Sequence, residues 1–199
     1  MMRRRDLLAL APTLFLPACS SAPEPKPAAK PAEPVTGLHA LYAMYQYARP
    51  WAQDLMVVRL SSIEITQVKD QAGKVAAWQA MFASPSHAQQ RAYTFSVFDA
   101  SSSLRSGIFA DSPIPLASDV HPFLLAAAKT DSDQAYQTAT EHAGEYGRKN
   151  PDMQITYLLE LGRRINDPIW RVIWGASITS SVFSVVIDAS TGQFIQTLS

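Results

Sequence analysis

The stretch FSVVIDAS at residues 183–190 decides the fold, because it recurs as FSVFDAS at residues 95–101 with one residue fewer. A second match lies upstream of each copy. WQAMF at 78–82 parallels WRVIW at 170–174, and the two aromatic residues are four positions apart in both. Matched segments in the same order indicate an internal repeat.

Two further matches extend the pattern toward the N-terminus. DLMVVRL at 54–60 parallels DMQITYL at 152–158. A helical pattern ends at a proline before each of these segments, at Pro50 in the first copy and at Pro151 in the second. Four matches in one order predict that the folded part is an internal duplication.

The second half reads as a helix followed by strands. N-cap candidates at residues 130–133 (TDSD) precede a helical stripe, and Gly147 and Pro151 end it. The stripe consists of Ala135, Ala139, His142, Ala143 and Tyr146. Segments rich in β-branched and aromatic residues then predict strands at 155–161, 169–174, 181–188 and 193–198, the last two joined by a tight turn at 189–192.

The first half fits the same plan. Leu38, Leu41, Tyr45 and Ala48 form its helical stripe. The predicted strands are 55–66, 75–83 and 92–99, with a hairpin turn at 70–74. Residues 102–130 form the join, and a short helix beginning at Pro122 could belong to the second unit, which would then have an ααβββ order.

The run VVIDASTGQFI at residues 185–195 resembles the end of a PepSY domain, in which a strand closes with Asp-Ala-x-Thr-Gly and a further apolar strand follows. The preceding helix, the Asn-Pro-Asp break at 150–152 and the aromatic strand 170–174 also fall where that family places them. The resemblance implies an α+β fold of two tandem repeats, 37–110 and 133–199, each a helix packed on an antiparallel sheet of three to four strands, with 111–132 as a connecting segment. The arrangement is also similar to β-lactamase inhibitory protein and to small outer-membrane assembly lipoproteins of the BamE type.

The N-terminus reads as a targeting segment. Three arginines (Arg3 to Arg5) precede an apolar stretch at 7–16, which is shorter than the roughly 20 residues that span a bilayer. Residues 16–19, Leu-Pro-Ala-Cys, are similar to the lipobox of bacterial lipoproteins, so we expect a signal peptide at 1–18 and lipid attachment at Cys19. The paired arginines leave both Sec and Tat export open. Ser20 stands where an inner-membrane retention aspartate is often found, which favours the outer membrane.

Residues 19–36 are predicted to be a lipidated stalk. Proline recurs every second or third position in 20–34, which favours an extended spacer of about 45 Å. Cys19 is the single cysteine, so an intrachain disulfide, a catalytic thiol and a cysteine zinc site are excluded. Cleavage before Cys19 leaves 14 basic and 16 acidic residues, and no basic cluster suggests a nucleic-acid partner.

Few residues are candidates for catalysis or metal binding. The four histidines lack metal-ligand spacing, and no nucleophile motif or phosphate loop is present, so we expect no metal, no cofactor and no enzyme activity. Asp99 and Asp188 occupy matching positions, where paired carboxylates could do acid–base work. Because each precedes a turn, bonding to backbone amides is the favoured role.

Aromatic residues are the remaining candidates. Trp170, Val172 and Trp174 alternate along a strand and are predicted to be core. Tyr42 and Trp51 fall off the helical stripe and are the candidate partner-binding residues. We therefore expect a non-catalytic envelope lipoprotein, anchored on the periplasmic face of the outer membrane, that binds or modulates a periplasmic protein or peptide. The alternative is a structural or assembly role at the outer membrane, like that of BamE.

Overall fold

The computed structural model describes residues 33–163, 165–177, 179 and 182–199. The strands are β1 (Val35–Thr36), β2 (Met56–Ile63), β3 (Lys74–Val75), β4 (Ala77–Ser84), β5 (Gln89–Ser96), β6 (Gly107–Ala110), β7 (Ile114–Pro115), β8 (Ile155–Leu161), β9 (Pro168–Trp174), β10 (Phe183–Asp188) and β11 (Phe194–Leu198). The helices are α1 (Gly37–Ala48), α2 (Ser132–His142), α3 (Gly144–Lys149) and a 3-10 helix, η1 (Leu125–Ala127). The predicted class, α+β with antiparallel strands, is confirmed.

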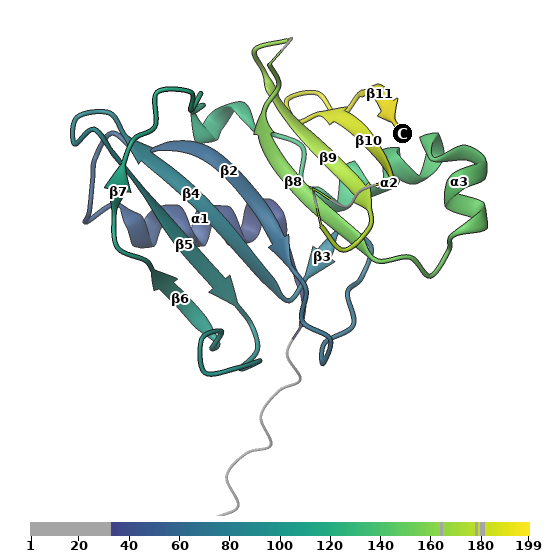
Figure 1. Ribbon diagram of the computed structural model, residues 1–199, viewed down its shortest axis with the longest axis horizontal. Coiled ribbons are helices and arrows are strands. Elements are labelled where there is room, and N and C mark those ends of the chain that lie inside the picture. Colours follow the sequence, from purple (N-terminus) through teal and green to yellow (C-terminus); the bar gives the residue numbers. More distant parts are fainter. Residues whose placement is uncertain (1–32, 164, 178, 180–181) are drawn as a thin grey trace, which may run out of the picture. The chain divides into compact units, whose positions relative to one another are not determined.

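Nine strands form one sheet in the order β11-β10-β9-β8-β2-β4-β5-β6, with β7 also paired to β5 (Figure 1). From the middle of the sheet, β2, β4, β5 and β6 run outward after α1, and β8, β9, β10 and β11 run outward after α2. The central strands β2 and β8 pair antiparallel, with Leu60 opposite Leu159. One edge of this sheet is therefore formed by β6 and β7, which pair with different parts of β5, and the other edge by β11.

Both long helices cover the same face of the sheet (Figure 1). The hydrophobic core lies between this face and the helices and runs continuously across the β2–β8 junction. Its largest fully buried side chains are Trp78, Trp170, Tyr93, Phe82, Leu41, Met44, Leu60 and Leu159. The predicted core positions on β9, Trp170, Val172 and Trp174, are all at most 3% exposed, so that prediction is confirmed.

The two helices begin next to each other, and Asp131 caps both. Its carboxylate accepts the backbone N–H of Ser132 in a capping box with Gln134, and its Oδ1 also accepts the N–H of Leu38 at 2.8 Å. The hydroxyl of Ser132 accepts the N–H of Gly37 at 2.7 Å. First-turn N–H groups need such acceptors because the helix itself offers none. The predicted cap of α2 is confirmed, and it also serves α1.

Several predicted boundaries differ from the structure. Val35–Thr36 were placed in the stalk, but they form β1 and pair with β3. The connecting segment 111–132 is built into the fold, because β7 pairs with β5 and Phe123 bridges Val57. The predicted second helix is interrupted, because Gly144 adopts a left-handed φ of 58° between α2 and α3.

The proposed alignment of 95–101 with 183–190 is wrong in register. Trp78 on β4 lies opposite Phe95, whereas Trp170 on β9 lies opposite Ile187, four residues after Phe183. In addition, β5 ends at Ser96, so most of FSVFDAS lies beyond the strand, whereas most of FSVVIDAS lies within β10. The two similar stretches therefore occupy different positions relative to their strands, because strand register follows pairing and burial rather than local sequence.

Candidate functional site

An aromatic groove of about 860 Å³ lies between the C-terminal end of α1 and the strands β5 and β6. Its lining residues are Gln46, Tyr47, Pro50, Trp51, Arg91, Tyr93, Phe109 and Ala110. Three elements that are distant in sequence thus supply one surface, which we call the aromatic groove. Its composition, rich in Trp, Tyr and Arg, is that of protein-binding hot spots.

The end of α1 places Trp51 in the groove. The helix ends at Ala48, Pro50 prevents its continuation, and the N–H of Trp51 bonds the carbonyl of Ala48 at 2.9 Å. This turn lays the indole ring edge-to-face on His87, with ring centres 6.0 Å apart, and tilted against Tyr93 at 6.5 Å. Trp51 is half-buried and held by these rings.

Arg91 lies at the floor of the groove on β5. Its Nε donates to the carbonyl of Asp111 at 2.5 Å, and its guanidinium lies 6.0 Å from the centre of the Trp51 ring and 5.5 Å from that of Tyr93. Both distances fit cation–π contacts. Among the described residues the ion pair found is Lys149–Glu145, and no carboxylate pairs with Arg91. The groove therefore carries a positive charge without an anionic partner in this part of the chain.

Tyr93 adds a buried hydroxyl beside Arg91. The residue is 1% exposed, and its hydroxyl makes no hydrogen bond with the described residues. Burial raises the pKa of Tyr93, while the Arg91 charge acts in the opposite direction. The guanidinium of Arg91 therefore lies near enough to the phenol of Tyr93 to favour its ionised form. Tyr47 packs edge-to-face on the Tyr93 ring at 6.3 Å and is itself 54% exposed.

The structure separates the two predicted partner-binding residues. Trp51 lines the aromatic groove, whereas Tyr42, although 47% exposed, is not among the groove residues. The groove instead adds Tyr47, Arg91 and Phe109. Tyr47 is another aromatic residue that falls off the predicted stripe of Leu38, Leu41, Tyr45 and Ala48. Arg91 and Phe109 had no such signal, because strand pairing alone brings them to the groove.

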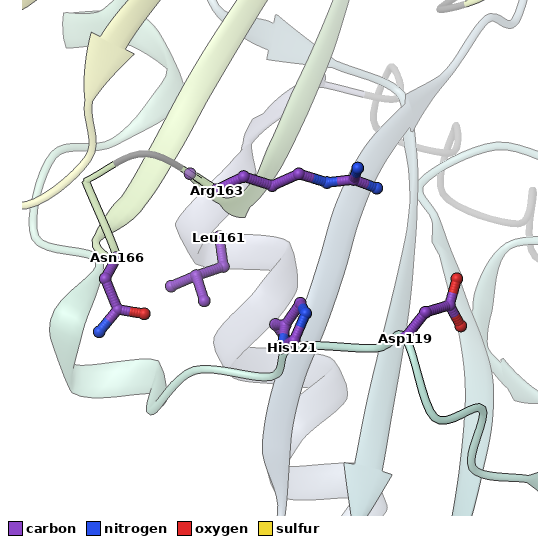
Figure 2. Close-up of a pocket in the computed structure, with 6 residues that line it drawn as sticks. Asp119, His121, Leu161, Arg163 and Asn166 are labelled. Atoms are coloured by element: carbon purple, nitrogen blue, oxygen red, sulfur yellow. The ribbon is translucent and has the colours of Figure 1, made fainter.

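A second hollow, of about 400 Å³, lies where the join meets the β8–β9 turn and has a lining of mixed polarity (Figure 2). Its lining includes Asp119, His121, Arg163 and Asn166. Figure 2 shows the Asp119 carboxylate pointing away from the His121 ring, so these two side chains do not form an acid–base pair. No serine, threonine, cysteine or lysine is among the described residues that line this hollow.

The other predicted site residues have structural roles or lie elsewhere. The Asp188 carboxylate accepts the N–H groups of Ser190 and Thr191, and that of Asp99 accepts the N–H of Ser106, which confirms the predicted bonding to backbone amides. No group of three or more His, Cys, Asp or Glu residues that could hold a metal occurs within the described residues. Cys19 and the rest of the signal and lipidation segment lie outside them.

Comparisons with known proteins found few similar proteins. No protein-family model matches the chain, and no curated protein matches it. One solved structure is similar, that of a candidate lipoprotein from Clostridium difficile 630, with 12% identity and a TM-score of 0.49. The match covers 79% of this chain and 90% of that one. Across the residues with described structure, no helix is both long and apolar enough to span a bilayer.

Proposed function

We propose that this chain is a non-catalytic envelope lipoprotein whose folded part binds a periplasmic protein or peptide through the aromatic groove. One observation carries the proposal: Tyr47, Trp51 and Arg91 form an accessible cluster around a cation that no described carboxylate neutralises. Large aromatic and arginine side chains dominate binding energy at protein interfaces. An unbalanced cation among them favours a partner with complementary charge.

Lipid anchoring at Cys19 is the second part of the proposal, and it rests on the sequence of residues 1–34. An apolar segment too short to span a bilayer ends in Leu-Pro-Ala-Cys, and the proline-rich stretch after it suits a tether. Ser20 supports the outer membrane as destination. We expect wild-type protein in the outer-membrane fraction and Cys19→Ala protein in the soluble periplasm. Equal membrane retention of both would remove the lipid anchor from the proposal.

The tandem PepSY-like interpretation also belongs to the proposal. It is supported by the order of elements, because α1 and α2 are each followed by four strands that run outward from the sheet centre. Trp78 and Trp170 support it as well. Trp78 lies near the start of β4 and Trp170 near the start of β9, the second of the four strands that follow α1 and α2 respectively. Each donates its indole N–H to a carbonyl two residues before a helix. Such a duplicated unit, which we propose to be non-catalytic, suits a binding module.

Site-specific photo-crosslinking in living cells tests the function. A photoreactive phenylalanine analogue is placed at Tyr47 in the groove or at Tyr42, which is similarly exposed on the same helix and does not line the groove. We expect a discrete protein crosslinked from position 47 and not from position 42. A partner belonging to outer-membrane assembly machinery, or to the cell wall, would instead support the structural role. Equal crosslinking from both positions would exclude the groove as the binding surface.

A further inference from the structure

The edge strand β6 has backbone groups that the sheet leaves unpaired. β6 pairs with β5 in the register Ala110–Tyr93, Phe109–Thr94, Ile108–Phe95 and Gly107–Ser96. The N–H of Asp111 donates to the carbonyl of Ala92, so Asp111 points its backbone groups toward β5. Alternate residues of an antiparallel strand point opposite ways. The N–H and C=O groups of Ile108 and Ala110 therefore point outward, where a further strand can pair with them.

The aromatic groove opens beside this edge, and Ala110 belongs to both. Ala110 lies opposite Tyr93, so the two side chains share the helix-covered face of the sheet. Ala110, with its small methyl group, lines the groove together with Tyr47 and Tyr93. A residue placed opposite Ala110 on an added strand would project its side chain toward the same face, and hence into the groove.

The charge in the groove selects the kind of side chain. An added strand would lie two strand spacings from β5, and Arg91 is two residues along β5 from Tyr93, which faces Ala110, so the Cα of a residue opposite Ala110 would lie roughly 12 Å from that of Arg91. Glutamate and arginine side chains reaching toward each other can span that distance. Arg91 is held by a carbonyl and two aromatic rings and has no anionic partner among the described residues, so a carboxylate would complete its charge balance.

From this geometry we propose that the groove and the β6 edge together bind an extended peptide segment, which adds as a tenth strand and inserts an acidic side chain beside Arg91. This inference rests on the proposed function, because it names the form and charge of the partner at the same site. Main-chain bonds to Ile108 and Ala110 would supply affinity, and Arg91 with Tyr47 would supply specificity.

Binding is measured with the purified lipidated protein in detergent and three capped octapeptides of alternating valine and threonine. The peptides differ at one central threonine position, which carries glutamate, glutamine or lysine. We expect the glutamate peptide to bind about tenfold more tightly than the glutamine peptide, as for a charge-assisted hydrogen bond, and the lysine peptide to bind more weakly still. Arg91→Gln should remove this order while retaining the weaker backbone-driven binding.

Amide hydrogen exchange of the wild-type protein reports strand addition without any variant. The N–H groups of Ile108 and Ala110 should become protected when the glutamate peptide is added, and amides of the opposite edge strand β11 should not. Ala110→Pro removes an outward N–H and leaves the β5–β6 hydrogen bonds in place, so it should weaken all three peptides. Far-ultraviolet circular dichroism confirms that this variant folds.

Two results would overturn the inference. One is unchanged exchange at Ile108 and Ala110 in saturating peptide, and the other is equal affinity for the glutamate and lysine peptides. If crosslinking from position 47 is still specific while either result is found, the partner docks through a folded surface. In that case the proposed function stands and the added strand is excluded.

Discussion

Trp78 and Trp170 meet at the centre of the core, with their rings edge-to-face and the ring centres 6.3 Å apart. Both are fully buried. The indole N–H of Trp78 donates to the carbonyl of Val35 at 3.1 Å, and that of Trp170 to the carbonyl of Thr130 at 2.8 Å. Each carbonyl lies two residues before a helix, so this pair ties both helix starts to the sheet.

Trp170→Phe should destabilise the protein by about 2 kcal/mol. The substitution removes the hydrogen bond to Thr130 and leaves that buried carbonyl without its donor, in addition to reducing the packed volume. Urea unfolding followed by circular dichroism measures the change. Trp51→Phe, at a half-buried position in the groove, is the matched control and should cost much less. Equal losses for the two variants would contradict a central role for the Trp170 bond.

Gly37→Ala should also destabilise, although alanine is the better helix former. A Cβ at position 37 would lie 2.6 Å from Cη2 of Trp170 and 3.2 Å from Cη2 of Trp78, inside the packed core. Overpacking of this kind costs about 1–3 kcal/mol. Because phenylalanine lacks the Cη2 atom, the double variant with Trp170→Phe should lose less than the two single losses combined. If the losses in unfolding free energy of the two single variants simply added in the double variant, the clash would be relieved elsewhere.

Asp131→Ala should cost about 2 kcal/mol, more than loss of an ordinary N-cap, because the carboxylate caps two helices. Asp131→Asn keeps a side-chain oxygen acceptor and should retain most of the stability. Thermal unfolding of the three proteins measures the difference. If the alanine and asparagine variants were equally unstable, the negative charge rather than hydrogen-bond acceptance would be the stabilising feature.

Asp70→Asn should change how stability depends on pH. Burial raises the pKa of Asp70 from 3.8 to about 6, and repulsion from Glu64 adds to this, while a hydrogen bond from the Ala76 N–H acts against it. Its Oδ1 is buried without a hydrogen-bond partner in the described part of the chain. Between pH 3.8 and about 6 the folded state therefore binds more protons than the unfolded state, so this group lowers stability as the pH rises and the loss persists above pH 6.

The asparagine variant should thus match wild type near pH 4 and exceed it in melting temperature at pH 7.5. Melting curves at both pH values measure this difference. Asp152→Asn is the control, because Asp70 and Asp152 both line a third hollow, of about 410 Å³, and this substitution also removes one charge. A gain at pH 7.5 of the same size in the control would assign the effect to net charge rather than to the buried carboxylate of Asp70.

The sequence alone determined the features that depend on neighbouring residues. Alternation of Trp170, Val172 and Trp174 identified a buried strand face, and Asp131 was among the cap candidates that precede a helical stripe. The α+β class followed from the same local periodicities, because side-chain spacing along the chain reports which face of an element is buried. Trp51 was predicted to be a partner-binding candidate for a local reason too, since it lies off the helical stripe, and the structure places it in the aromatic groove.

Only the tertiary structure decided which strands pair and which surfaces result. Arg91 lies 6.0 Å from the centre of the Trp51 ring and Phe109 lines the same groove because β5 and β6 pair at the edge of the sheet, whereas Tyr42 stays outside the groove despite its exposure. The register of Phe95 against Trp78 also differs from that of Phe183 against Trp174, although the stretches that contain the two phenylalanines look alike. A strand's own sequence reveals which of its residues face inward. Its partner and register depend on packing across the whole core, and the groove and the free edge are products of that packing.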